Sequence, residues 1–253
     1  MVCIFFVACS DENTSTPDSG ALDHSIVFDA QPGDVAVSVD APTEPRAIQL
    51  PADEAPHADP VEWWYYTGQL TTEEGDLYGF QAVIFQMMFL PGKPLYVSNA
   101  ALTDVSAQRY FEEADTTAGA QPAAEKGFDL TVNEMRLAGH DGKDRLEMEV
   151  EGIGVELDLQ ALKPPVIQYG TGYMTVGSSE PFYYYSYTRM SASGTLIRDG
   201  KRIPVTGGAW MDHQWGTIGK DYGWDWFSLY LDDDTELMLF IVKRTNQEGF
   251  LGG

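Results

Sequence analysis

The residues best suited to chemistry gather in one short stretch of the chain, residues 209–227. His213, one of four histidines, directly follows Asp212, and Asp225 lies further along the same stretch. An imidazole can take up or release a proton near neutral pH, and burial among apolar rings raises the pKa of an aspartate so that it can act as an acid. If the protein is an enzyme, we therefore predict His213, Asp212 and Asp225 as its catalytic residues. The alternative is that Asp212 and His213 form a hydrogen-bonded structural pair.

The six tryptophans fall in two clusters, one in this stretch and one near residue 63. Aromatic ring faces attract cations by about 0.5–2 kcal/mol and also form apolar ligand walls. Glu62, beside two tryptophans, is a further candidate acid, with backbone bonding as its structural alternative. The rings could instead fill a core or a seam between domains. The predicted ligand-binding residues are Glu62, Trp63, Trp64, Tyr65, Trp210, Trp215, Trp224 and Trp226.

Several other chemistries lack their sequence signatures. The chain has no Gly-x-Ser-x-Gly motif and no glycine-rich phosphate loop. Its two cysteines, Cys3 and Cys9, precede the folded part, so no thiolate metal site is expected there. The remaining histidines, His24, His57 and His140, lie in tether or turn contexts without a ligand partner. We therefore predict neither a metal ion nor a cofactor.

The charge balance disfavours nucleic acid as a partner. Lys and Arg number 15 against 39 Asp and Glu, which gives a formal net charge of −24. Such a surface repels phosphate backbones and anionic headgroups. The hydrophobic content of 43% is sufficient for a folded core.

The N-terminal residues predict a membrane anchor followed by a tether. Residues 1–9 form a short apolar run that ends in Phe-Val-Ala-Cys and resembles a lipobox, with Cys9 as the lipidated residue, although no basic residue precedes the run. Residues 10–56 are acidic, rich in proline and poor in large apolar residues, which predicts a disordered tether. The expected location is the bacterial cell envelope, lipid-anchored or secreted, with membrane contact only through the lipid.

The pattern after residue 57 is that of antiparallel strands. Residues 145–150 and 155–159 alternate apolar and polar side chains, which predicts strands with one buried face. Asp-Gly pairs at 141–142 and 199–200 indicate tight hairpins. We expect a mobile loop over 114–126. The fold class is all-β, an antiparallel barrel of about eight strands, with a β-sandwich as the alternative.

Two motifs in this order, Glu-Trp-Trp-Tyr at 62–65 and Trp-Met-Asp-His-Gln-Trp-Gly at 210–216, resemble a lipocalin-like family. The family comprises carotenoid 1,2-hydratase (hydroxyneurosporene synthase), AttH and predicted secreted hydrolase proteins. The resemblance implies two successive calycin-type barrels. The first would span 57–220. Residues 221–253 would form the first strands, 224–232 and 235–244, of a second barrel that is truncated, or those strands would complete the first barrel.

The resemblance leaves several functions open. The first is a cell-envelope protein whose aromatic-lined cavity binds a hydrophobic small molecule, lipid- or isoprenoid-like. The second is a hydro-lyase or cyclase acting on an isoprenoid or polyene, with an aspartic acid and His213. The third is a non-catalytic scaffold. The entirely apolar run 237–242 favours binding, because a hydratase would need an acid on that strand.

Overall fold

The computed structural model describes residues 7–8, 46–174, 182–217, 222–244 and 247–252. Two short 3-10 helices interrupt the strands, η1 (Ala52–Glu54) and η2 (Gln168–Gly170). None of the helices in these ranges is long and apolar enough to span a bilayer. The strands are β1 (Val7–Ala8), β2 (Val61–Thr72), β3 (Leu77–Leu90), β4 (Lys93–Asp104), β5 (Arg109–Ala118), β6 (Phe128–Val132), β7 (Met135–His140), β8 (Lys143–Val150), β9 (Ile153–Ala161), β10 (Val166–Ile167), β11 (Tyr173–Met174), β12 (Phe182–Arg198), β13 (Lys201–Gly216), β14 (Tyr222–Tyr230), β15 (Glu236–Arg244) and β16 (Gln247–Gly252).

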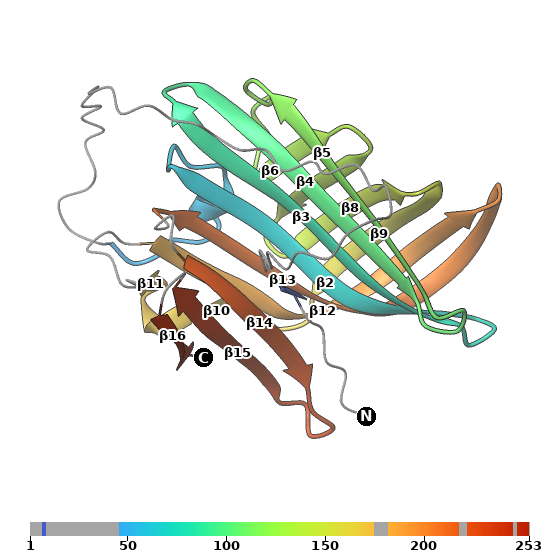
Figure 1. The fold of residues 1–253 in the computed structure, drawn as a ribbon. Helices are drawn as coiled ribbons and strands as arrows, with labels where there is room; N and C mark the ends of the chain where they lie inside the picture. Colours follow the sequence, from blue (N-terminus) through green and yellow to red (C-terminus); the bar gives the residue numbers. More distant parts are fainter. Residues whose placement is uncertain (1–6, 9–45, 175–181, 218–221, 245–246, 253) are drawn as a thin grey trace, which may run out of the picture.

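One sheet of 12 strands curls into a nearly closed barrel, which confirms the predicted all-β antiparallel class (Figure 1). Its order is β5-β4-β3-β2-β13-β12-β9-β8-β7-β6, and β10 and β11 pair with β12. Side chains of the edge strand β5 contact turns on the other side of the described sheet, after β6 and after β8. Asn133 Nδ2 donates to Asp115 Oδ1 at 2.7 Å, and the main-chain nitrogen of Glu151 donates to Glu113 Oε2 at 3.0 Å.

The predicted alternation and both Asp-Gly hairpins are confirmed. Residues 146, 148 and 150 of β8 and 155, 157 and 159 of β9 are buried, and the residues between them are more exposed. Asp141 and Gly142 have φ values of 53° and 69°, and Asp199 and Gly200 have 52° and 72°. Two consecutive residues with positive φ are what a type I′ hairpin turn requires.

The second sheet has the order β1-β14-β15-β16, separate from the barrel sheet. The two expected strands are present as β14 and β15, and β16 is a third. Their pairing in a sheet of their own rules out the alternative that they complete the first barrel. The sheet packs on the outside of β2, β3 and β13 (Figure 1). We call this interface the seam. Its buried hydrophobic residues are Trp63, Tyr65, Val83, Trp210, Trp226, Phe240 and Val242.

The predicted tether extends too far toward the C-terminus, because residues 46–56 pack against the barrel. Asp53 and Glu54 in this capping segment are only 5% and 2% exposed. Arg46 holds Asp53 through two hydrogen bonds of 2.6 Å, and Glu54 accepts a hydrogen bond from the main-chain nitrogen of Asp141 at 2.9 Å. These partners allow the acids to be buried, which composition alone could not indicate. Cys9 and residues 10–45 lie outside the described residues.

The expected loop over 114–126 begins later than predicted. Residues 114–118 belong to β5 and pair with residues 95–99 of β4. The small residues and threonines of this segment form no strong apolar pattern that would predict a strand. Pairing with β4 stabilises the strand instead.

Candidate functional site

Strand alternation separates the predicted catalytic pair. Asp212 and His213 are neighbours on β13, so their side chains point to opposite faces of the sheet. His213 lies in the barrel interior and Asp212 in the seam, each 3% exposed or less. The proposed Asp212–His213 unit is therefore wrong. The same alternation splits the tryptophans: Trp64 and Trp215 belong to the interior core, and Trp63 and Trp210 belong to the seam.

Sheet register assembles a different group around His213. Residues Tyr96, Gln86, Glu62, Trp215 and Tyr183 are successive cross-strand partners on β4, β3, β2, β13 and β12. The adjacent inward row contains Ile84, Trp64, His213 and Tyr185. Cross-strand partners on one face lie about 4.5–5.5 Å apart, so residues distant in sequence become neighbours.

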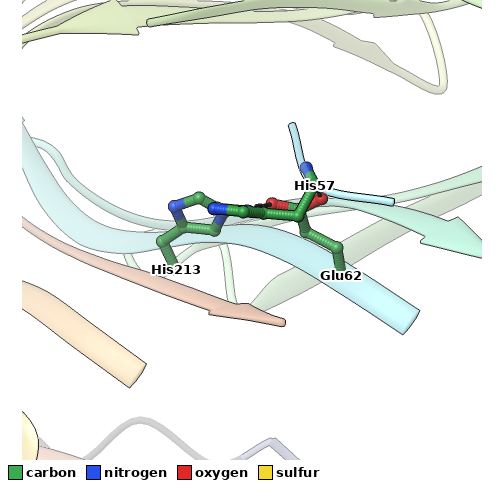
Figure 2. A group of neighbouring side chains, drawn as sticks. All are labelled: His57, Glu62 and His213. Carbon is green, nitrogen blue, oxygen red and sulfur yellow. Dashed lines mark hydrogen bonds and ion pairs between the residues drawn. The ribbon is translucent and has the colours of Figure 1, made fainter. Parts of the chain in front are cut away.

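Glu62 lies at the centre of this group, between two imidazoles (Figure 2). Glu62 Oε1 is 2.8 Å from His57 Nδ1 and 2.7 Å from His213 Nε2. Neither Glu62 nor His213 is exposed, whereas the side chain of His57 is 17% exposed. His57 precedes β2, and it connects the buried pair to the surface. We call these three residues the His–Glu–His cluster.

Every remaining polar atom of the His–Glu–His cluster also has a neighbour. Glu62 Oε2 accepts hydrogen bonds from the main-chain nitrogen of His57 at 2.7 Å and from Gln86 Nε2 at 3.2 Å. His213 Nδ1 is 3.1 Å from the Tyr185 hydroxyl, and His57 Nε2 is 3.6 Å from Asp53 Oδ1. Tyr96 in turn donates to Gln86 Oε1 at 2.7 Å. The carboxylate and both rings are thus fixed in orientation.

The pKa values of the two histidines are shifted in opposite directions. Burial would lower the pKa of His57, but the hydrogen bond and negative charge of Glu62 outweigh burial and raise that pKa. Burial lowers the pKa of His213, and its bond to Glu62 offsets this only in part. His57 is therefore the imidazole that favours a positive charge, while the deeper His213 favours the neutral form.

Stacked rings extend from the His–Glu–His cluster to the capped end of the barrel. His57 stacks on Trp215 at 4.1 Å between ring centroids, and Tyr183 stacks on the same indole at 5.2 Å. Tyr173 meets Tyr183 edge-on at 5.9 Å. Deeper inside, Trp64 stacks on His213 at 4.7 Å, and its indole N–H lacks a partner among the described residues. We call the first four rings, His57, Trp215, Tyr183 and Tyr173, the ring ladder.

Asp212 forms hydrogen bonds with residues of the seam face of the sheet. Its Oδ1 accepts hydrogen bonds from Ser186 Oγ at 2.6 Å and from Trp210 Nε1 at 2.7 Å. Burial raises the pKa of Asp212 to about 6, against the lowering effect of those hydrogen bonds. Trp226 of the second sheet meets Trp210 edge-on at 5.7 Å. This arrangement explains four predicted ligand-binding residues, Trp63, Tyr65, Trp210 and Trp226, as packing between the two sheets.

Asp225 does not belong to the interior group either. It alternates on β14 with Trp224 and Trp226, which pack on the seam, so its side chain points away from the barrel. Trp224 stacks on Trp63 at 5.9 Å. This placement puts the wall of the barrel between Asp225 and His213, and it gives no support to the predicted joint role of the two residues.

Sequence patterns did not indicate His57, Gln86, Tyr96 or Tyr185. His57 was placed in a tether or turn context, whereas in the structure it lies beside Glu62 and His213. Alternate residues of a strand face the same side of the sheet. This rule, applied to β2 and β13, places Glu62, Trp64, His213 and Trp215 on inward faces. No local signal in the sequence indicates that His57 folds back on Glu62.

A second buried polar group occupies the same capped end. Tyr66 donates to Asp144 Oδ2 at 2.7 Å, and Glu54 lies 2.9 Å from His140 Nδ1. Burial raises the pKa of Asp144 to about 7; the hydrogen bond from Tyr66 opposes this rise and the charge of Glu54 adds to it. Asp144 thus keeps its proton to a much higher pH than an ordinary aspartic acid.

A groove of about 570 Å³ crosses the outside of the barrel. Its lining includes Asp129, Ala138, Arg145, Asp158 and Ser193, which are successive cross-strand partners on the outward face. Charged side chains dominate this row, and His213 does not line it. The groove therefore differs from the aromatic-lined cavity that the sequence analysis expected.

Comparison with known proteins agrees with the fold. A crystal structure described as an AttH protein from Nitrosomonas europaea has a TM-score of 0.64 and 23% identity, covering 83% of this chain and 73% of that one. Kievitone hydratase from Nectria haematococca has a TM-score of 0.56 and 14% identity, covering 81% and 68%. No curated protein matches. The AttH-like family model matches residues 41–253, and the chain therefore belongs to the AttH-like family.

Proposed function

We propose that this protein binds a hydrophobic small molecule, lipid- or isoprenoid-like, at the capped end of the barrel. The ring ladder carries the proposal, because it ends at a polar cluster. Trp215 stacks with both His57 and Tyr183, and His57 joins the ladder to Glu62. The exposed parts of His57 and Tyr173, the outer rings of the ladder, offer apolar surface to a hydrocarbon body, and the cluster offers hydrogen-bonding groups to a hydroxyl or carboxyl end.

The closeness of packing limits how the molecule binds. His213, Glu62 and Trp64 have no exposed surface, so a ligand meets the cluster through His57 and the half-buried Tyr173. The ligand would lie over the ring ladder. This differs from a ligand enclosed deep among the tryptophans.

Two tryptophans of one strand provide a matched test. Trp215 and Trp210 are both 2% exposed on β13, but Trp215 faces the interior and Trp210 the seam. Purified protein is incubated with oleic acid and with farnesol, and retained ligand is measured by native mass spectrometry. Wild type and Trp210→Leu should retain ligand, while Trp215→Leu should bind at least about 10-fold more weakly, a loss of about 1.4 kcal/mol. Circular dichroism establishes that both variants are folded.

The same experiment distinguishes binding from catalysis. The fold is shared with a hydratase, so addition of water to a double bond is the second candidate function. Ligand recovered with unchanged mass supports binding, and recovery with the mass of one added water supports hydration. Failure of the wild type to retain either molecule, or equal loss in both variants, would overturn the proposed site.

A further inference from the structure

We propose that His57, Glu62 and His213 form a binding site for one divalent transition-metal ion, with zinc as the best match. The inference goes beyond the binding of a hydrophobic molecule and does not depend on it. Two imidazole nitrogens and one carboxylate oxygen are a donor set that zinc takes in sites with three protein ligands. Figure 2 shows these side chains converging from β2, β13 and the segment before β2.

The ligand atoms already lie close to one another. His57 Nδ1, Glu62 Oε1 and His213 Nε2 are all within 4.8 Å of one another, and both nitrogens are within 2.8 Å of the oxygen. Tetrahedral zinc with bonds of about 2.0–2.1 Å separates its ligand atoms by about 3.4 Å. Glu62 Oε1 therefore has to withdraw from each ring by about 0.6–0.7 Å, which a side-chain torsion can supply.

The contacts behind the ligand atoms fit a metal site. Ligating histidines usually direct their other ring nitrogen at a carboxylate or another polar group, which fixes the ring. Here His57 Nε2 faces Asp53 at 3.6 Å, and His213 Nδ1 faces the Tyr185 hydroxyl at 3.1 Å. Glu62 Oε2 is held by Gln86 and by the main-chain nitrogen of His57. The three atoms that remain, one from each residue, are the ligand atoms that lie within 4.8 Å of one another.

The local charge also favours a cation. Glu62 is completely buried and Asp53 is 5% exposed, so two carboxylates lie in a region with little water. Arg46 is engaged with Asp53 through both of its terminal nitrogens. A divalent ion would compensate the buried charge of Glu62 directly. Three protein ligands would leave one coordination position for water.

The test uses metal alone. The full chain is stripped with a chelator and titrated with zinc sulfate by calorimetry and with cobalt(II), whose visible absorption reports coordination by nitrogen and oxygen. We expect one ion per chain. Loss of a residue that contacts a metal ligand, and not the metal itself, typically lowers metal affinity by about 10–100-fold. Asp53→Asn should lower zinc affinity within that range, and His57→Gln, which removes a ligand, should lower it more than about 100-fold.

His140→Gln is the matched control. His140 also lies beside a buried glutamate, Glu54, at 2.9 Å, but outside the His–Glu–His cluster. The zinc affinity of the His140→Gln variant should equal that of the wild type. His57 is the most exposed member of the cluster, so its glutamine variant is the one best able to fold, and circular dichroism establishes that it has. Absence of stoichiometric zinc binding in the wild type, or unchanged affinity in folded His57→Gln, would overturn the metal site and leave the ring-ladder experiment intact.

Discussion

Asp144 should make the stability of this protein fall as pH rises, and Asp144→Asn should remove the contribution of Asp144 to that dependence. The native pKa of about 7 lies well above the ordinary value of 3.8. Because the native state holds its proton more tightly, the unfolded state binds fewer protons between these pH values, and stability decreases with pH. The loss is complete once pH exceeds about 7.

The expected magnitude follows from the two pKa values. Their difference corresponds to about 4 kcal/mol at 1.36 kcal/mol per pH unit. Asparagine keeps an oxygen for the Tyr66 hydroxyl but cannot ionise, so the variant avoids this loss. Relative to wild type, the variant should therefore gain up to about 4 kcal/mol between about pH 4 and about pH 8.

Urea unfolding, followed by tryptophan fluorescence across that pH range, measures the effect. Glu74→Gln, the same type of change on the exposed turn between β2 and β3, is the control and should follow the wild-type curve. If Asp144→Asn and wild type lose stability in parallel as pH rises, Asp144 is ionised in the native state and the reasoning is refuted.

The remaining predictions concern packing. Trp226→Ala should lower the free energy of unfolding of the second sheet by about 3–5 kcal/mol, because it removes a large buried side chain from the seam. A separate early transition in calorimetry would show this loss, and an unchanged melting curve would contradict it. Gly207→Ala should lower the melting temperature strongly, because its Cβ would lie 1.8 Å from a backbone oxygen of β2. The control Gly200→Ala meets no atom within 4 Å and should cost only about 1–2 kcal/mol from its positive φ, so equal effects would exclude the clash between β13 and β2 as the cause.

Local patterns predicted the strands and turns correctly where each residue's own preference decided the structure. The alternation at 145–150 and the Asp-Gly pair at 199–200 specify a strand and a type I′ turn without reference to the rest of the chain. Residues 114–118 show the limit of this reasoning, because their strand exists through pairing with β4.

The candidate site was predicted in part. Glu62, Trp64, His213 and Trp215 were named and lie together in the interior. Trp210, Asp212 and Asp225 were assigned to the same site because they are close in sequence. In a strand, however, closeness in sequence places side chains on opposite faces.

The fold class, the family and the two aromatic motifs follow from the sequence alone, because they depend on local periodicity and on residues that are contiguous in the chain. Which residues of those motifs meet depends on long-range strand pairing. The pairing of β2 with β13 sets Glu62 against Trp215 and Trp64 against His213. The capping segment also brings His57 against Glu62. No periodicity in the sequence encodes this contact, because the burial of the acids in the capping segment depends on partners that are distant in the sequence. Long-range pairing and charge compensation together place His213 with Glu62 and His57 inside the barrel, and Asp212 outside it.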